Sequence, residues 1–131
     1  MGQRKEINTL DDVKFLVDTF YGKVRQDEML ADIFNNVIQD KWPEHLEKLG
    51  RFWQTVLLEE HTYYGSPFLP HAQLPVEWQH FERWLKLFIE TVDDNFIGQK
   101  AEQAKWQANR MAQMFHSKIE FYKNNTSSPL L

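Results

Sequence analysis

Two histidines set among bulky aromatic residues are the side chains of this chain best suited to chemistry. His45 lies on the apolar face of an expected helix that begins near Pro43. His71 lies in a proline-rich, non-helical stretch just before another expected helix. A loop histidine that faces a helix histidine among apolar residues can hold a flat apolar cofactor through its metal, which indicates haem. On local sequence alone, an exposed loop histidine is the simpler interpretation of His71.

The composition is compatible with a pocket for a flat ligand and excludes several kinds of site. With 131 residues the chain can form one domain with a sizeable core, and 15% of its residues are aromatic. A well-filled core would explain the aromatic content equally well. The absence of cysteine excludes disulfides, cysteine–zinc sites, iron–sulfur clusters and thiol catalysis.

Charge and hydropathy argue against nucleic acid as a partner and against a membrane-spanning segment. The net charge is −4, and lysine and arginine are scattered among acidic residues without a basic run, so nucleic acid is not expected as a partner. No stretch approaches the roughly 20 apolar residues of a membrane span. The N-terminal residues lack the apolar segment of a secretory signal, so a cytoplasmic protein is expected.

Hydrophobic periodicity predicts an all-α fold, with no stretch of period two and no internal repeat. A capping-box variant at residues 9–12 opens a first helix that reaches about residue 26. Its expected inward positions are Val13, Leu16, Val17, Phe20, Tyr21 and Val24. A turn-like segment at 29–34 precedes a helix with Pro43 in its first turn.

A loop of about 15 residues follows residue 60, and two longer helices are expected at about 75–92 and 99–122. Small inward residues on the last helix, including Ala101, Ala104 and Ala108, would let it cross a neighbour closely. We expect a single domain over 1–131, with an N-terminal extension at 1–8 and a disordered tail at 124–131.

The order and spacing of several motif residues resemble those of the truncated haemoglobins, specifically the third group of that family. The residues that carry the resemblance are Phe20, Tyr21, Phe34, His45, Trp53, His71, Arg83 and Trp84. The resemblance covers roughly residues 8–123. The other two groups carry Gly-Gly pairs around the helix junctions, and none of the five glycines here are adjacent.

The resemblance implies a truncated globin, a two-over-two helical sandwich around haem b. It assigns the proximal iron ligand to His71 and the distal histidine to His45. From this placement, Tyr21 and Trp84 become expected hydrogen-bond donors to bound dioxygen. His45 could donate to the ligand, gate its entry or coordinate iron. The expected cofactor-binding residues are Phe34, His45, Lys48, Leu49, Phe52, Trp53, His71 and Trp84.

Two of these assignments rest on helix geometry. Leu49 lies one turn after His45 and is expected to pack on the distal face of the haem. Lys48 neighbours His45 on the helix surface and is expected near a haem propionate, with a solvated lysine as the alternative.

The expected function is binding of dioxygen and other diatomic ligands, such as carbon monoxide and nitric oxide, at a pentacoordinate or exchangeable iron. An oxygen-transport role belongs to the same class. The alternative is redox chemistry, peroxidase-like or nitric-oxide-detoxifying, which leaves open whether the protein is an enzyme. Because no reductase domain or flavin motif accompanies the expected globin, steady turnover would need an external reductase. A monomer or weak dimer is expected.

Two rival functions lie outside the haem interpretation. The residues from Glu77 to His80 match the Glu-x-x-His motif of di-iron bundles, but such sites need two copies and further glutamates. A haem-free helical interaction module would not need the tyrosine, the tryptophan and the two motif histidines together. His61, His80 and His116 are assigned to the surface.

Overall fold

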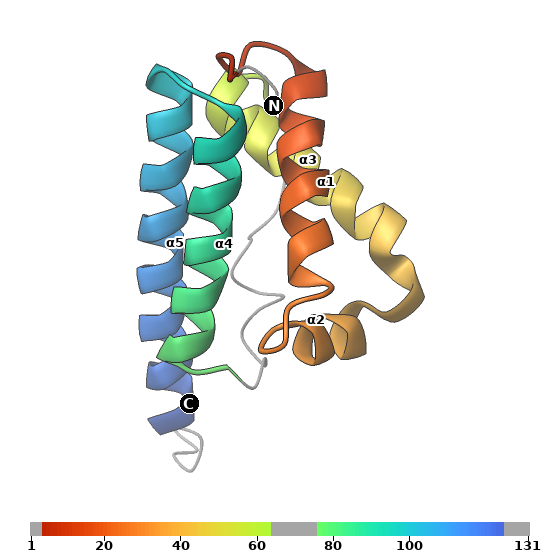
Figure 1. Ribbon diagram of the computed structural model, residues 1–131. Helices are drawn as coiled ribbons and strands as arrows, with labels where there is room; N and C mark the ends of the chain where they lie inside the picture. The colour runs from red at the N-terminus through yellow and green to blue at the C-terminus, as the bar shows by residue number, and fades with distance from the viewer. Residues whose placement is uncertain (1–3, 64–75, 125–131) are drawn as a thin grey trace.

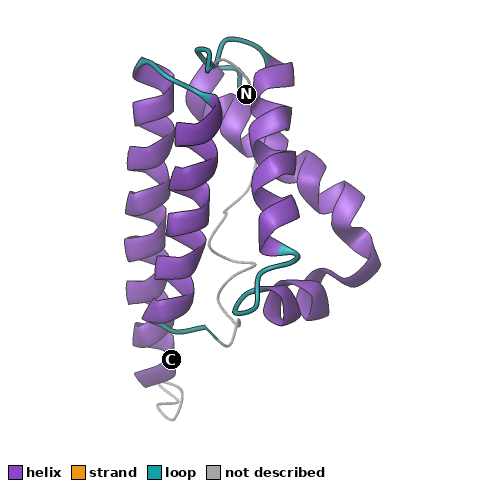
Figure 2. Ribbon diagram, in the orientation of Figure 1, coloured by secondary structure: helices purple, strands orange, loops and turns teal. Residues whose placement is uncertain are grey.

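The computed structural model describes residues 4–63 and 76–124, which fold almost entirely into helices (Figure 2). The elements are α1 (Leu10–Val24), α2 (Ala31–Ile38), a short 3-10 turn η1 (Gln39–Lys41), α3 (Trp42–Leu58), α4 (Trp78–Asn95) and α5 (Gln99–Asn124). No β-strand occurs within the described ranges, and the all-α prediction is confirmed. None of the helices found there is both long and apolar enough to cross a membrane.

The long helices form two pairs (Figure 1). α4 and α5 lie side by side along their length, and α1 packs against α3. α1 also packs against α4 and so joins the pairs into the predicted two-over-two arrangement. The main hydrophobic core lies where α1, α3 and α4 meet, and the first turns of α5 close it.

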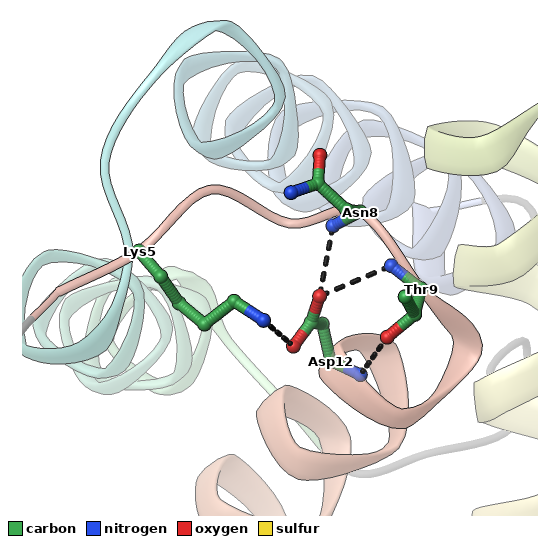
Figure 3. A network of polar contacts seen from close by, with 4 residues as sticks. All are labelled: Lys5, Asn8, Thr9 and Asp12. Atoms are coloured by element: carbon green, nitrogen blue, oxygen red, sulfur yellow. Dashed lines mark hydrogen bonds and ion pairs between the residues drawn. The ribbon is translucent and has the colours of Figure 1, made fainter.

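Helix α1 begins where the sequence predicts, at a capping box formed by Thr9 and Asp12 (Figure 3). The backbone N–H of Asp12 donates to Thr9 Oγ1 at 3.2 Å, and the N–H of Thr9 donates to Asp12 Oδ2 at 3.0 Å. Asp12 also accepts from the N–H of Asn8 at 2.9 Å and from Lys5 Nζ at 2.8 Å. The predicted inward stripe of the helix is buried: Val13, Leu16, Val17, Phe20, Tyr21 and Val24.

These contacts also set the acidity of Asp12. Burial acts to raise the pKa of the carboxyl, but the Lys5 ammonium and the N–H groups of Asn8 and Thr9 outweigh burial and lower the pKa from 3.8 to about 2. The folded state therefore binds this proton more weakly than the unfolded chain does. Asp12 stabilises the fold above about pH 4, and this contribution is lost as the pH falls toward about 2.

We expect Asp12→Ala to lower the free energy of unfolding near neutral pH by about 1–2 kcal/mol, because a helix cap and a charged contact are lost together. Urea unfolding measures the difference between the two proteins, which should shrink below about pH 3. Asp11→Ala, at an exposed position in the same turn, is the control and should cost only about 0.5 kcal/mol. A difference that stays constant down to low pH would contradict this account.

The segment after α1 is more helical than the sequence predicts. The turn-like segment expected at 29–34 is replaced by α2 and the η1 turn. The physical reason is the buried carboxylate of Asp27, which accepts from the N–H groups of Met29 at 3.0 Å and Leu30 at 3.1 Å. These bonds satisfy donors that a helix start would otherwise leave unpaired, so α2 can begin without a conventional cap.

Helix α3 has Pro43 in its first turn, as predicted. Trp42 Nε1 donates to Asn35 Oδ1 at 3.0 Å and fastens the start of α3 to α2. The helix ends at Glu59, which adopts a left-handed conformation with φ 58°. Its buried side chains include Trp53 and Leu57.

Small side chains line the buried face of α5. Ala101, Ala104 and Ala108 of α5 are all buried, as predicted, and let α5 approach its neighbours closely. Between α4 and α5, Gly98 turns the chain with φ 99°, a conformation that favours glycine.

The residues before α1 hold a defined place against the helices. Ile7 is fully buried, and the backbone of Lys5 bonds to Asn95 at 3.3 Å and Ile97 at 2.9 Å. At the other end, α5 extends to Asn124, slightly past its predicted end. The rest of the expected tail, and residues 1–3, lie outside the described residues.

Candidate functional site

A mostly apolar pocket is formed by side chains of both helix pairs and α2. It brings together eight of the predicted site residues: Tyr21, Phe34, His45, Lys48, Leu49, Phe52, Trp53 and Trp84. They come from α1, α2, α3 and α4, so the fold gathers side chains that are widely separated in the sequence. The remaining predicted site residue, His71, lies outside the described residues.

Tyr21 of α1 and Trp84 of α4 meet in this pocket. Burial raises the pKa of the Tyr21 hydroxyl to about 12, although a hydrogen bond with Trp84 acts to lower it. The indole N–H can only donate, so Trp84 is the donor in this bond and the Tyr21 oxygen the acceptor. The Tyr21 hydroxyl keeps its own proton at neutral pH and remains available as a donor inside an apolar pocket.

An aromatic cluster behind the pair holds both rings in place. The ring of Phe20 contacts Tyr21, Trp84 and Phe88 edge-on, with centroids 4.6, 5.3 and 5.0 Å away. Trp84 also stacks on Phe88 at 5.7 Å. Phe20 and Phe88 are each only 1% exposed, so the cluster is part of the rigid core.

Helix α3 supplies a second wall of the pocket. The half-buried ring of His45 lies edge-on to Tyr21 at 6.3 Å and to Trp42 at 5.8 Å. Leu49, one turn later, is half-buried and lines the pocket, while the neighbouring Lys48 is exposed at its rim. This wall therefore combines a titratable ring, an apolar surface and a cation.

The other predicted aromatic residues complete an apolar lining. Trp53 is 2% exposed, and Phe52 packs edge-on against it at 5.3 Å and against Tyr63 at 5.5 Å. Phe34 of α2 lies tilted against Tyr21 at 6.3 Å. Aromatic faces of this kind suit a large flat apolar ligand.

Comparisons with known proteins agree with the helix arrangement and identify the family. Residues 6–119 match the family model described as Bacterial-like globin. The chain is 37% identical over 111 residues to Group 3 truncated hemoglobin ctb of Campylobacter jejuni, an alignment that covers 82% of this chain and 87% of that protein. This chain belongs to the group III truncated haemoglobins.

A solved structure supports the same assignment of the truncated haemoglobin. The crystal structure of group III truncated hemoglobin from Campylobacter jejuni matches it with a TM-score of 0.81 and 34% identity, over 89% of this chain and 95% of that chain. The family and the truncated-globin fold predicted from the sequence are both confirmed.

Membership of this family implies ligand binding through haem, and the pocket of this truncated haemoglobin has the residues to hold that group. Its lining is mainly aromatic and aliphatic, as a porphyrin requires. The exposed ammonium of Lys48 at the rim suits a carboxylate, and the buried Tyr21 hydroxyl offers a donor inside. The side chains present therefore fit haem.

Eight further residues of the truncated haemoglobin line the pocket without having been predicted as site residues: Leu30, Tyr63, Val76, His80, Phe81, Met111, Ala112 and Phe115. Several of them, such as Met111 and Phe115, lie on helix faces that periodicity marks as inward. Periodicity cannot distinguish a core position from a pocket wall, because both require an apolar side chain facing inward.

The predicted surface positions of two histidines are wrong. His80 is half-buried and lines the pocket, and His116 is half-buried beside the ring of Trp78 at 5.1 Å. His61 is exposed, as predicted. His80 lies in the first turn of α4, one position before Phe81, and this position alone gives no local signal of the wall that the ring faces.

The hydrogen bonding of His80 limits what this ring can do. Its Nδ1 accepts from the backbone N–H of Glu77 at 2.9 Å. A neutral imidazole carries one proton, so that proton must be on Nε2. Nε2 is then a donor and has no free lone pair for a metal ion. In this arrangement His80 is unsuited to ligate iron.

A di-iron site gains no support from the described part of this globin. Residues 4–63 and 76–124 contain no group of three or more His, Asp or Glu side chains placed to hold a metal ion. The Glu77–His80 motif is instead used locally, at the start of α4. Haem iron in globins needs only one protein ligand, so no such cluster is required for it.

Proposed function

We propose that this chain binds haem b in the described pocket and binds dioxygen and other diatomic ligands at the haem iron. The observation that carries the proposal is the buried Tyr21 hydroxyl, a protonated donor whose oxygen accepts a hydrogen bond from Trp84. Haem supplies an iron atom with an open position for a diatomic molecule. The protein supplies a mostly apolar pocket and a donor that favours polar ligands, since the terminal atom of bound dioxygen carries partial negative charge.

The remaining site residues have proposed roles at the edges and faces of haem. His71 is proposed as the proximal ligand, and His45 as a distal residue beside Tyr21. Leu49, Phe34, Phe52 and Trp53 would pack against the porphyrin. Lys48 is the proposed partner of one propionate, because it is an exposed cation at the rim of the pocket.

His45 is expected to control access to the distal side. Its half-buried ring lies between the exposed surface of α3 and Tyr21, so removing it should open a path to the pocket. We expect His45→Ala to change the association rate of carbon monoxide several-fold, measured by flash photolysis. His61→Ala, at an exposed position, is the control. Unchanged rates and spectra in both oxidation states would remove His45 from the distal site.

Redox chemistry on nitric oxide or peroxide is the second candidate. The observation in its favour is that a titratable ring, His45, lies beside a protonated hydroxyl in the same pocket, and peroxide chemistry requires proton movement. Electrons would have to come from an external reductase. Kinetics with dioxygen, nitric oxide and peroxide, measured side by side, distinguish the candidates. Slow dioxygen release without peroxide turnover supports binding, and rapid turnover of peroxide or nitric oxide supports the redox function.

A further inference from the structure

A partly buried ion pair joins two segments that flank the pocket. The side chain of Asp27, just after α1, is 3% exposed, and that of Arg83 in α4 is 37% exposed. Both Nε and Nη2 of Arg83 donate to Asp27 Oδ1 at 2.6 Å. The other oxygen, Oδ2, accepts from the N–H groups of Met29 and Leu30. Each carboxylate oxygen of Asp27 is thus engaged by two donors.

The pair connects the elements that carry the donors of the pocket. Arg83 immediately precedes Trp84, and Asp27 ties down the chain between α1, which carries Tyr21, and α2. Leu30, whose backbone is held by Asp27, itself lines the pocket. In Figure 1 the end of α1 and the start of α4 lie at the same end of the molecule.

The energetics favour a role in orientation rather than in stability. An ion pair with one buried and one partly exposed partner gains little net stability, because the loss of hydration of the buried carboxylate and the screening of the exposed guanidinium offset most of the attraction. Its geometry is nevertheless directional, since a guanidinium can donate only within its own plane. A short, charge-assisted contact of this kind fixes the rotation of α4 about its axis, and its position along that axis, relative to the end of α1.

We propose that Asp27 and Arg83 form a positioning pair that holds Trp84 against the Tyr21 oxygen and thereby sets how strongly the pocket retains a polar diatomic ligand. The proposal rests on the proposed function for its effect on ligands, but the geometric part concerns this chain alone. Neither residue needs to touch the ligand. Loss of the pair should shift Trp84, and the Tyr21 hydroxyl would then be less well oriented to donate to a bound ligand.

The test compares two variants that remove the contact with two that preserve part of it. Asp27→Asn keeps an acceptor for the backbone N–H groups but loses the charge, and Arg83→Gln removes the guanidinium. We expect each to speed dioxygen dissociation by about three- to tenfold, with carbon monoxide dissociation changing less than about twofold. Arg83→Lys and Asp27→Glu keep the charges and should recover part of the wild-type rate.

A second readout does not depend on ligand release. The indole N–H resonance of Trp84, identified by its loss in Trp84→Phe, should shift in Asp27→Asn and Arg83→Gln because its hydrogen bond to Tyr21 changes. Lys105→Gln is the matched control. Lys105 of α5 forms an ion pair at 2.7 Å with Asp93 of α4, so this contact also involves α4. It lies at the surface and not in the pocket. Lys105→Gln should leave both the resonance and the rate unchanged.

The outcomes separate this proposal from the proposed function. An unmoved Trp84 resonance in folded Asp27→Asn and Arg83→Gln would overturn the positioning role, as would equal shifts in Lys105→Gln. If wild-type protein binds no haem, the proposed function fails, while the resonance in the protein as purified still decides the geometric part. In the double variant Asp27→Asn with Arg83→Gln, rates no faster than in either single variant support action as a unit.

Discussion

Replacing His71 with alanine should abolish stable haem binding, and added imidazole should restore part of it. Haem iron in globins is held by one neutral imidazole. Tyr63 and Val76, the described residues that flank segment 64–75, both line the pocket, so the chain leaves and re-enters the described part at the pocket wall. The other nearby candidate, His80, presents a protonated nitrogen. These observations leave His71 as the best candidate for the proximal ligand.

The measurement is the haem content of the purified variant and its ferrous spectrum, with and without imidazole. His80→Ala is the matched control, because it also removes a pocket-lining imidazole, and it should retain haem with a wild-type spectrum. If His71→Ala keeps an unchanged five-coordinate histidine-type ferrous spectrum, the assignment is wrong, and the bonding of His80 would have to change when haem binds.

Replacing Tyr21 with phenylalanine should speed dioxygen dissociation by roughly two- to tenfold, and more if the partial charge on bound dioxygen strengthens the bond. The reason is that phenylalanine preserves the packed ring and removes only the buried hydroxyl. Bound carbon monoxide is far less polar, so its dissociation should respond less. Stopped-flow measurement of both gases provides the comparison, and equal effects on the two gases would indicate a steric cause.

The hydrogen bond between the two side chains refines this prediction for Trp84. The sequence suggests two donors acting side by side, whereas a hydrogen bond with Trp84 contributes to the pKa of Tyr21, and the indole N–H can only be the donor in it. If Trp84 acts only by orienting the Tyr21 hydroxyl, Trp84→Phe should change dioxygen dissociation mainly through Tyr21. The double variant should then have the same dissociation rate as Tyr21→Phe alone. Independent, additive effects would mean that Trp84 turns to the ligand when one binds.

Much of the fold could be predicted because local signals and tertiary structure agree. The capping box at Thr9 and Asp12 marks the start of α1, and Pro43 marks the first turn of α3. The buried alanines of α5 follow directly from helical spacing. Eight predicted site residues line one pocket. Their proximity could be predicted from the family resemblance, because spacing along the sequence does not show which helices lie next to each other.

The features that the sequence did not reveal have different origins. Helix α2 was expected as a turn, although Asp27, which accepts from the N–H groups of Met29 and Leu30, lies only two and three residues before them. The partner of Asp27 is Arg83, far along the chain, and no local pattern connects them. His80 was assigned to the surface because a histidine in the first turn of a helix gives no sign of which wall it faces.

Titration of the apo-protein with hemin tests most directly whether the described pocket binds haem. We expect a Soret band distinct from that of free hemin, saturating at one haem per chain. Tryptophan fluorescence should fall in step, because Trp53 and Trp84 line the pocket. Trp106→Phe, which removes a 59% exposed indole, should give the same titration. Absence of a protein-specific Soret band after reconstitution would contradict the account and favour a haem-free helical module.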